Sequence, residues 1–197
     1  MAVSTKLSNK EIRRRERQRR QLVLRLVWGV VAALVAVVLG YGGWQALKPR
    51  PGVNVPVMAV RHIQIGEQHE PYNSDPPTSG PHYAEPAQAG FYDEALPDEQ
   101  LVHNLEHGYI VIWYNCTGLE ETTCEAFKAQ IRTVMDGAGT VGLSSSTKLI
   151  AVPRSTLTVS IVATSWGRLY QPKAFDPDEL LVFIKEFRNK APEPNAP

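Results

Sequence analysis

The feature that most constrains this chain is an uncharged, apolar segment near its N-terminus. Residues 28–47 form a run of 20 residues without Asp, Glu, Lys or Arg. Since an α-helix rises about 1.5 Å per residue, such a run is long enough to cross a hydrocarbon core of about 30 Å. The sequence therefore predicts one transmembrane helix over residues 26–47, in a single-pass integral membrane protein.

Charge is distributed unevenly on the two sides of this segment. Residues 1–25 contain nine Lys or Arg and two Glu, a net charge of +7, whereas residues 26–197 carry twelve basic and eighteen acidic residues, a net charge of −6. Because basic flanks are retained in the cytoplasm, we expect a cytoplasmic N-terminus, a cell-membrane anchor and an extracytoplasmic C-terminal domain. A net negative domain lacks the clustered positive charge that nucleic acid requires, so no nucleic-acid binding is expected.

A cleaved secretory signal is the alternative interpretation of the apolar segment. Its hydrophobic region would be about 7–15 residues long and would end at a small-x-small cleavage site. The run here is longer, and Gly-Tyr-Gly-Gly-Trp at residues 40–44 fits such a site poorly. We therefore favour an uncleaved signal anchor, and export of the following domain is expected in either case.

The two cysteines, Cys116 and Cys124, both lie in the part of the chain expected to be exported. In an oxidising compartment they are expected to form a disulfide that acts as a structural clip. A redox pair is disfavoured, because the CxxC spacing that lowers a thiol pKa is absent. Thiolate binding of a metal remains an alternative.

The rest of the sequence indicates one folded domain. A chain of 197 residues has room, outside the apolar segment, for one ordinary domain with a real core. The predicted segments are a basic cytoplasmic tail (1–25), the transmembrane helix (26–47), a linker (48–57), the extracytoplasmic domain (58–190) and a loose tail (191–197).

Hydrophobic periodicity predicts both helices and strands within the domain. Helices are expected at residues 97–107, 121–136 and from residue 176 onward. Strands are expected at residues 109–114, 149–152 and 159–163, with the last two joined by a short turn. This order predicts an α/β fold, a small two-layer domain with a mixed sheet. An extended piece at residues 59–65 would make the order thioredoxin-like, although several two-layer sandwiches fit as well.

All five histidines fall between residues 62 and 107. Histidine is the commonest metal ligand, so this clustering indicates a candidate metal site, with scattered surface histidines as the plain alternative. The sharpest pattern is His-Asn-Leu-Glu-His, in which His103 and His107 lie one helical turn apart and can reach one ion. Since Leu101 and Leu105 define the buried stripe of this helix, the two histidines should face solvent or the long preceding loop.

These considerations predict a site for copper or zinc. Its candidate ligands are His62, His82, His103, Glu106 and His107. The H-x-x-E-H pattern also marks the inverzincin metallopeptidases, in which the Glu is the base. A third ligand would then come from a later helix, with Glu179 or Glu186 as candidates. However, Gly108 ends the helix directly after His107, whereas a catalytic helix of that class would be longer. His107 as a cation at a helix C-terminus is the plain alternative.

The segment at residues 72–83, Tyr-Asn-Ser-Asp-Pro-Pro-Thr-Ser-Gly-Pro-His-Tyr, is the second unusual motif. Proline restricts φ and glycine permits unusual φ, so this loop can keep one shape without regular hydrogen bonding and form the wall of a site. The predicted wall residues are Tyr72, Asp75, Pro76, Pro77, Thr78, Ser79, Gly80 and Tyr83. Thr78 or Ser79 could be a nucleophile with His82 as its base, but the glycine pattern of a nucleophile elbow is absent around them.

Three features in combination carry a family resemblance. They are His62, the motif at residues 72–83, and Leu-Val-His-Asn-Leu-Glu-His-Gly-Tyr at residues 101–109. Over about residues 58–190 the chain resembles the bacterial family catalogued as domain of unknown function 3105. Members typically carry an N-terminal membrane helix, as is expected here. The family name implies no activity, so the resemblance transfers architecture and motif positions alone.

Three functions remain open from the sequence, and whether the protein is an enzyme is undecided. The first is metal binding outside the membrane. The second is a non-catalytic cell-envelope binding module that presents Tyr72, Tyr83 and Tyr92, and the third is a metal-dependent hydrolase with Glu106 or a histidine as base. The distances between the ring nitrogens of His82, His103 and His107 test the metal-binding function. Separations of about 3–4 Å suit a shared ion, whereas separations of more than about 8 Å exclude one. The protein partner, the substrate and the metal are not predicted.

Overall fold

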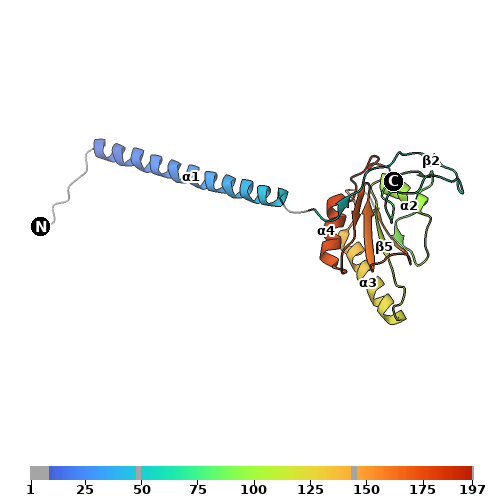
Figure 1. Ribbon diagram of the computed structural model, residues 1–197. Coiled ribbons are helices and arrows are strands. Elements are labelled where there is room, and N and C mark those ends of the chain that lie inside the picture. Colours follow the sequence, from blue (N-terminus) through green and yellow to red (C-terminus); the bar gives the residue numbers. More distant parts are fainter. Residues whose placement is uncertain (1–8, 48–49, 143–145, 197) are drawn as a thin grey trace. The chain divides into compact units, whose positions relative to one another are not determined.

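The computed structural model describes residues 9–47, 50–142 and 146–196. Contacts divide the chain into two compact units, Met1–Pro49 and Arg50–Pro197 (Figure 1). The first unit contains one helix and the second contains the folded domain. Each unit is described by itself.

The first unit is built from one long helix, α1 (Asn9–Ala46). Its segment Arg17–Trp44 is long and apolar enough to cross a membrane, by length and composition, although a signal sequence near an N-terminus has the same properties. The helix begins well before residue 26, where the membrane span was predicted to start. Residues 9–25 of the predicted basic tail are therefore helical, and residues 1–8 lie outside the described residues.

The domain is built on a mixed sheet of six strands in the order β1-β8-β7-β5-β6-β4. The strands are β1 (Val53–Asn54), β4 (Gly90–Phe91), β5 (Ile110–Tyr114), β6 (Leu149–Pro153), β7 (Ile161–Ser165) and β8 (Arg168–Tyr170). The central strand, β5, pairs in parallel with β6 and antiparallel with β7. The predicted mixed sheet is confirmed.

Helices pack against both faces of this sheet. They are α2 (Asp98–Glu106), α3 (Glu121–Ala138) and α4 (Pro177–Phe187). Successive side chains of a strand point to opposite faces. Accordingly Ile110, Ile112 and Tyr114 of β5 join the core under α3 and α4, while Val111 and Trp113 join the core under α2 (Figure 1). The α/β class and the predicted helices are confirmed, and α2 lies on the face opposite the layer formed by α3 and α4.

The strand predicted at residues 59–65 is different in the structure. It shortens to β2 (His62–Ile63), which lies outside the main sheet and pairs in parallel with β3 (His82–Tyr83). A thioredoxin-like strand order would require this strand in the main sheet. Because β2 lies outside that sheet, the domain does not have the thioredoxin-like order. The two strands predicted to be joined by a short turn are present as β6 and β7, but β5 lies between them.

Two predicted segment boundaries also change. Val53 and Asn54, placed in the linker by the sequence, form β1 and pair with β8, so the domain begins before residue 58. The predicted loose tail is bonded to the domain: the Glu193 N–H donates to the Glu106 carbonyl (3.0 Å). These backbone groups find partners at the end of α2, which holds the tail in place. Residues 48–49 and 197 lie outside the described residues.

The predicted disulfide is present. Cys116 and Cys124 have their sulfurs 2.00 Å apart and link the segment after β5 to the first turn of α3. Because bonded cysteines carry no thiolate, the alternative of thiolate metal ligation is not supported in the oxidised chain.

Candidate metal centre

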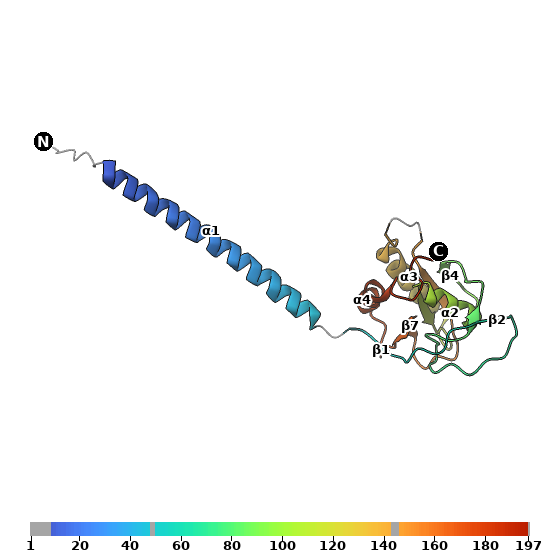
Figure 2. The same ribbon diagram turned by 90° about the horizontal axis from the view of Figure 1, so that it is seen from above.

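Three short elements bring the predicted histidines together. In the β2–β3 pair, His62 lies directly opposite His82. His103 lies on α2, and two views of the ribbon place α2 beside β2 (Figure 1, Figure 2). The ring centroid of His82 lies 4.9 Å from that of His62 and 5.1 Å from that of His103. The His62 and His103 rings are stacked, with their centroids 5.4 Å apart.

These three side chains can share one metal ion. One potential ligand atom from each of His62, His82 and His103 lies within 4.8 Å of the other two. Two nitrogens bound to one zinc at about 2.0–2.1 Å in tetrahedral geometry would lie roughly 3.3 Å apart. Side-chain rotations that close these separations would bring the three imidazoles to ligand distance.

Backbone carbonyls fix the orientation of two of these rings. The Nδ1–H of His82 donates to the Gly80 carbonyl (2.8 Å), and the Nδ1–H of His103 donates to the Tyr83 carbonyl (2.5 Å). Since a carbonyl oxygen only accepts, the proton of each neutral ring resides on Nδ1 and the lone pair on Nε2. Metal-binding histidines commonly have their second ring nitrogen held in this way.

The Nε2 atom of His82 is buried and makes no hydrogen bond. The nearest carboxylate oxygen, Oε2 of Glu106, lies 3.0 Å away, at ion-pair distance but outside hydrogen-bond geometry. Burial is the main cause that lowers the pKa of His82; the bond to the Gly80 carbonyl and the charge of Glu106 oppose it. A neutral ring with a buried lone pair at Nε2 is suited to bind a metal.

The two histidines of the H-x-x-E-H motif lie next to each other at the C-terminal end of α2. Nε2 of His103 lies 2.9 Å from Nε2 of His107, and the ring centroids are 4.4 Å apart. Neither faces solvent, since His103 and His107 are only 5% and 7% exposed: His103 faces the long loop through the Tyr83 carbonyl, whereas His107 faces Glu193 of the C-terminal segment. His107 adjoins the cluster through His103.

A model of the family described as protein of unknown function (DUF3105) matches residues 62–197. The chain belongs to this family. No curated protein and no solved structure gave a significant match. The DUF3105 match begins at His62 and extends through the tail that docks on α2, so it contains every candidate ligand.

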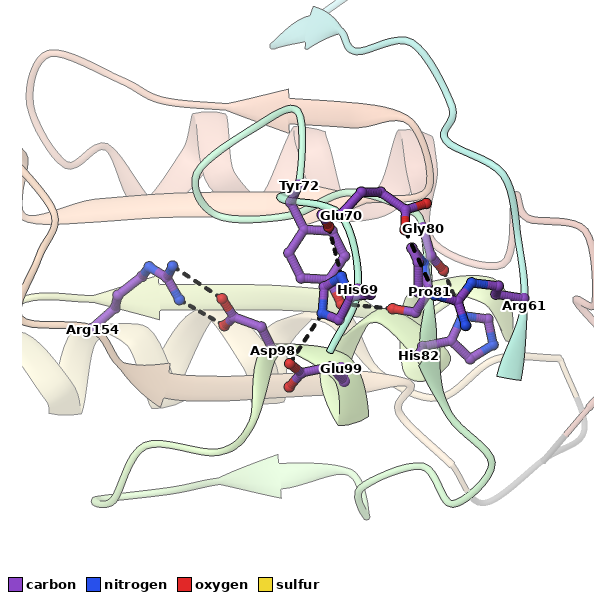
Figure 3. A network of polar contacts seen from close by, with 10 residues as sticks. All are labelled: Arg61, His69, Glu70, Tyr72, Gly80, Pro81, His82, Asp98, Glu99 and Arg154. Atoms are coloured by element: carbon purple, nitrogen blue, oxygen red, sulfur yellow. Dashed lines mark hydrogen bonds and ion pairs between the residues drawn. The ribbon is translucent and has the colours of Figure 1, made fainter. Parts of the chain in front are cut away.

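In this DUF3105 domain, part of the predicted loop wall serves the histidines directly. Gly80 and Tyr83 supply the two carbonyls that orient the rings. The Tyr72 hydroxyl donates to the Pro81 carbonyl (2.6 Å), and its ring packs against Gly80, where a Cβ would meet it at 3.1 Å (Figure 3). Tyr72 therefore braces the turn that presents His82.

The other predicted wall residues make their polar contacts away from the histidines. Asp75 pairs with Arg154, the Thr78 carbonyl accepts from the Gly167 N–H (3.1 Å), and Ser79 Oγ accepts from the Met58 N–H (3.0 Å). Pro76 and Pro77 are buried. These five residues anchor the DUF3105 loop to its surroundings. A sequence pattern cannot distinguish this anchoring role from the lining of a site.

His69 is the histidine that was not predicted as a ligand, and it lies apart from the cluster. Its Nδ1–H donates to the Glu70 carbonyl (2.7 Å), and Nε2 faces Glu99 Oε1 at 3.3 Å (Figure 3). Two residues that contact the candidate site or its helix were not predicted from the sequence of this DUF3105 domain: Glu193, whose Oε2 lies 3.6 Å from His107 Nε2, and Arg154, which bonds Asp98 on α2. No local pattern marks either, because both meet the site through long-range contacts.

Proposed function

We propose that this domain binds a transition-metal ion through His62, His82 and His103, with Glu106 and His107 adjoining. The observation that carries this proposal is the gathering of three potential ligand atoms within 4.8 Å of one another. Support comes from the Nδ1–H groups of His82 and His103, which donate to carbonyls, so that each neutral ring carries its lone pair on Nε2.

The donor set favours zinc or copper. Imidazole suits Zn, Cu, Fe and Ni, whereas Mg and Ca prefer sites built from oxygen ligands. The cysteines are bonded to each other, so soft thiolate ligands are not part of the site. Zinc and copper are therefore the first ions to test.

The two alternatives are less well supported. A hydrolase needs an open cleft around its base, but His82 is fully buried and Glu106 is only 6% exposed, and the two face each other. An aromatic binding module needs accessible tyrosines that converge. Tyr72 and Tyr92 instead donate to carbonyls of their own loops. The described residues that line the pocket beside β2 include a single aromatic residue, Tyr83, so the three tyrosines do not converge there.

We also propose that α1 anchors the domain to the cell membrane as an uncleaved span, with the N-terminus in the cytoplasm and the domain outside. Support comes from the apolar segment of α1, the net charge of +7 over residues 1–25 and the disulfide, a bond that persists in oxidising compartments.

Metal binding is tested on the full-length chain purified in detergent. Elemental analysis after exposure to Zn²⁺ or Cu²⁺ and desalting should find one ion per chain, and the ion should raise the thermal midpoint. His103→Gln should abolish stoichiometric binding. His69→Gln is the matched control, because His69 lies in the same part of the chain but outside the cluster. A wild-type chain that retains no metal, or equal binding by both variants, would disprove the proposal.

A further inference from the structure

The last described segment, residues 189–196, forms a strap across the C-terminal end of α2. The Asn189 N–H donates to the Gly108 carbonyl (2.7 Å), and the Glu193 N–H donates to the Glu106 carbonyl (3.0 Å). Two backbone bonds thus hold the strap against Glu106, which is part of the H-x-x-E-H motif, and against Gly108, which directly follows the motif.

Lys148 anchors the strap from the other side. It is 4% exposed, and its Nζ donates to the carbonyls of Pro194 and Ala196 (both 2.8 Å) and of His107 (2.9 Å). A buried ammonium group requires such acceptors. Lys148 therefore joins the end of α2 to the part of the strap directly after Glu193, which restricts where the Glu193 side chain can lie.

The strap places a carboxylate at the edge of the histidine cluster. Glu193 Oε2 lies 3.6 Å from His107 Nε2, and His107 Nε2 lies 2.9 Å from His103 Nε2. Two ligands of one tetrahedral zinc ion would be separated by roughly 3.3 Å. The Glu193–His107 and His107–His103 separations are thus each close to the spacing of two ligands of one ion.

Charge also favours a carboxylate here. Neutral imidazoles leave the charge of a divalent ion uncompensated, and a buried net charge is costly unless it is paired. Glu106, beside His82, supplies one negative charge. Glu193 lies at the edge of the cluster with its side chain 59% exposed and can supply a second, so the two carboxylates together would match the charge of a divalent cation.

We propose that Glu193 is a metal ligand delivered by the strap, which completes a site for a divalent rather than a monovalent ion. This inference rests on the proposed metal binding by the histidines and adds the carboxylate, the role of the strap and the charge of the ion. Lys148 is a positioning residue that acts through the strap.

Zn²⁺ titration of the full-length chain in detergent tests the assignment, with Glu193→Gln as the variant. We expect its Zn²⁺ affinity to fall by about tenfold or more, within the range that loss of a metal-site partner costs. The Co²⁺-loaded variant should also show a changed visible absorption spectrum, because an oxygen ligand is lost. A merely structural role would leave that spectrum unchanged.

Glu186→Gln is the matched control, because it removes the same charge from a residue that pairs with Arg50 and Lys190 instead. It should bind Zn²⁺ like the wild type. Equal affinities and spectra for Glu193→Gln and wild type would overturn the assignment while leaving the histidine site in place. Equal weakening by both variants would also overturn it, as a general charge effect. A wild-type chain that binds no Zn²⁺ would reject the metal site itself.

Discussion

At the scale of single residues, two backbone carbonyls determine what the histidine cluster can do. The carbonyls of Gly80 and Tyr83 take the Nδ1 protons of His82 and His103. Both rings then carry their lone pair on Nε2, the form that binds a metal, and that of His103 accepts from His107 Nε2 (2.9 Å). Because the proton positions follow from backbone geometry, the proposed metal site is organised in the absence of an ion.

Gly80 is the residue at which this organisation is most sensitive to substitution. Its φ of +125° is one that side-chain-bearing residues rarely adopt, and a Cβ would approach the Tyr72 ring at 3.1 Å. We expect Gly80→Ala to lower the free energy of unfolding by about 1–3 kcal/mol, as for other strained backbone positions. Denaturant unfolding of the metal-free chain measures this loss.

Gly118→Ala is the control for that experiment. Gly118 also has a positive φ, +80°, but has open space where a Cβ would be placed. Its substitution should cost less, because strain acts there without crowding. If the two substitutions cost the same, the packing of Tyr72 on Gly80 does not stabilise the loop as described.

At the scale of elements, Arg154 holds the Pro-rich loop against α2. Its guanidinium donates to both carboxylate oxygens of Asp98, at 2.7 and 3.1 Å (Figure 3). The guanidinium pairs with Asp75 of the loop as well. It also lies over the Trp113 ring, 5.0 Å from the centroid. The elements that carry His82 and His103 are therefore linked through one side chain that follows β6.

For this reason Arg154→Met should lower the free energy of unfolding by more than the loss of an ordinary surface ion pair does. We expect a decrease of about 1.5–3 kcal/mol in the free energy of unfolding, typical of lost hydrogen bonds to charged groups. Lys128→Met is the comparison: its partners Asp93 and Glu125 are largely exposed, so less than about 1 kcal/mol should be lost. A cost for Arg154→Met no larger than that for Lys128→Met would show that the loop and α2 are held by other contacts.

The strap gives a second prediction at this scale. Lys148→Met removes the donor to Pro194 and Ala196, so we expect the Glu193 amide to exchange its hydrogen faster than in the wild type. Amides of β5, which lies in the core, should keep their protection. Lys185→Met on the exposed side of α4 is the control. Unchanged exchange at Glu193 in Lys148→Met would contradict the anchoring role.

Predictability from sequence also differs between elements. The spacing of His103 and His107 and the stripe of Leu101 and Leu105 predicted their placement, because a helix is a local structure with a fixed period. The parallel pairing that sets His62 opposite His82 could not be predicted, since each strand has two residues and no periodic pattern. His62 was predicted as a ligand from the clustering of the histidines, without its partner strand.

Long-range contacts explain the remaining omissions. Glu193 and Arg154 meet the site across separations of 86 residues to His107 and 56 residues to Asp98, and nothing in their local sequence marks them. Conversely, Thr78 and Ser79 were predicted beside the site because they lie in an unusual motif, yet their contacts serve to anchor the loop. A motif indicates that a segment is constrained, but not which side of it faces the site.

At the scale of the whole molecule, the proposed topology predicts on which side of the membrane each end lies. A phosphatase that folds only in an oxidising compartment should be active when fused after residue 197 and inactive when fused before residue 1. The fused chain should keep its full length in membranes, because the anchor is proposed to be uncleaved. Activity of the N-terminal fusion would reverse the orientation, and a shortened membrane-free product would identify residues 28–47 as a cleaved signal.

The central claim is that imidazoles of His62, His82 and His103 hold one metal ion. It is tested most directly by a crystal structure of the zinc-loaded chain, with diffraction recorded at the zinc absorption edge. We predict one anomalous peak at about 2.0–2.1 Å from Nε2 of His82 and of His103. A zinc-loaded crystal with no peak between these rings, or with its peak elsewhere on the domain, would contradict the claim.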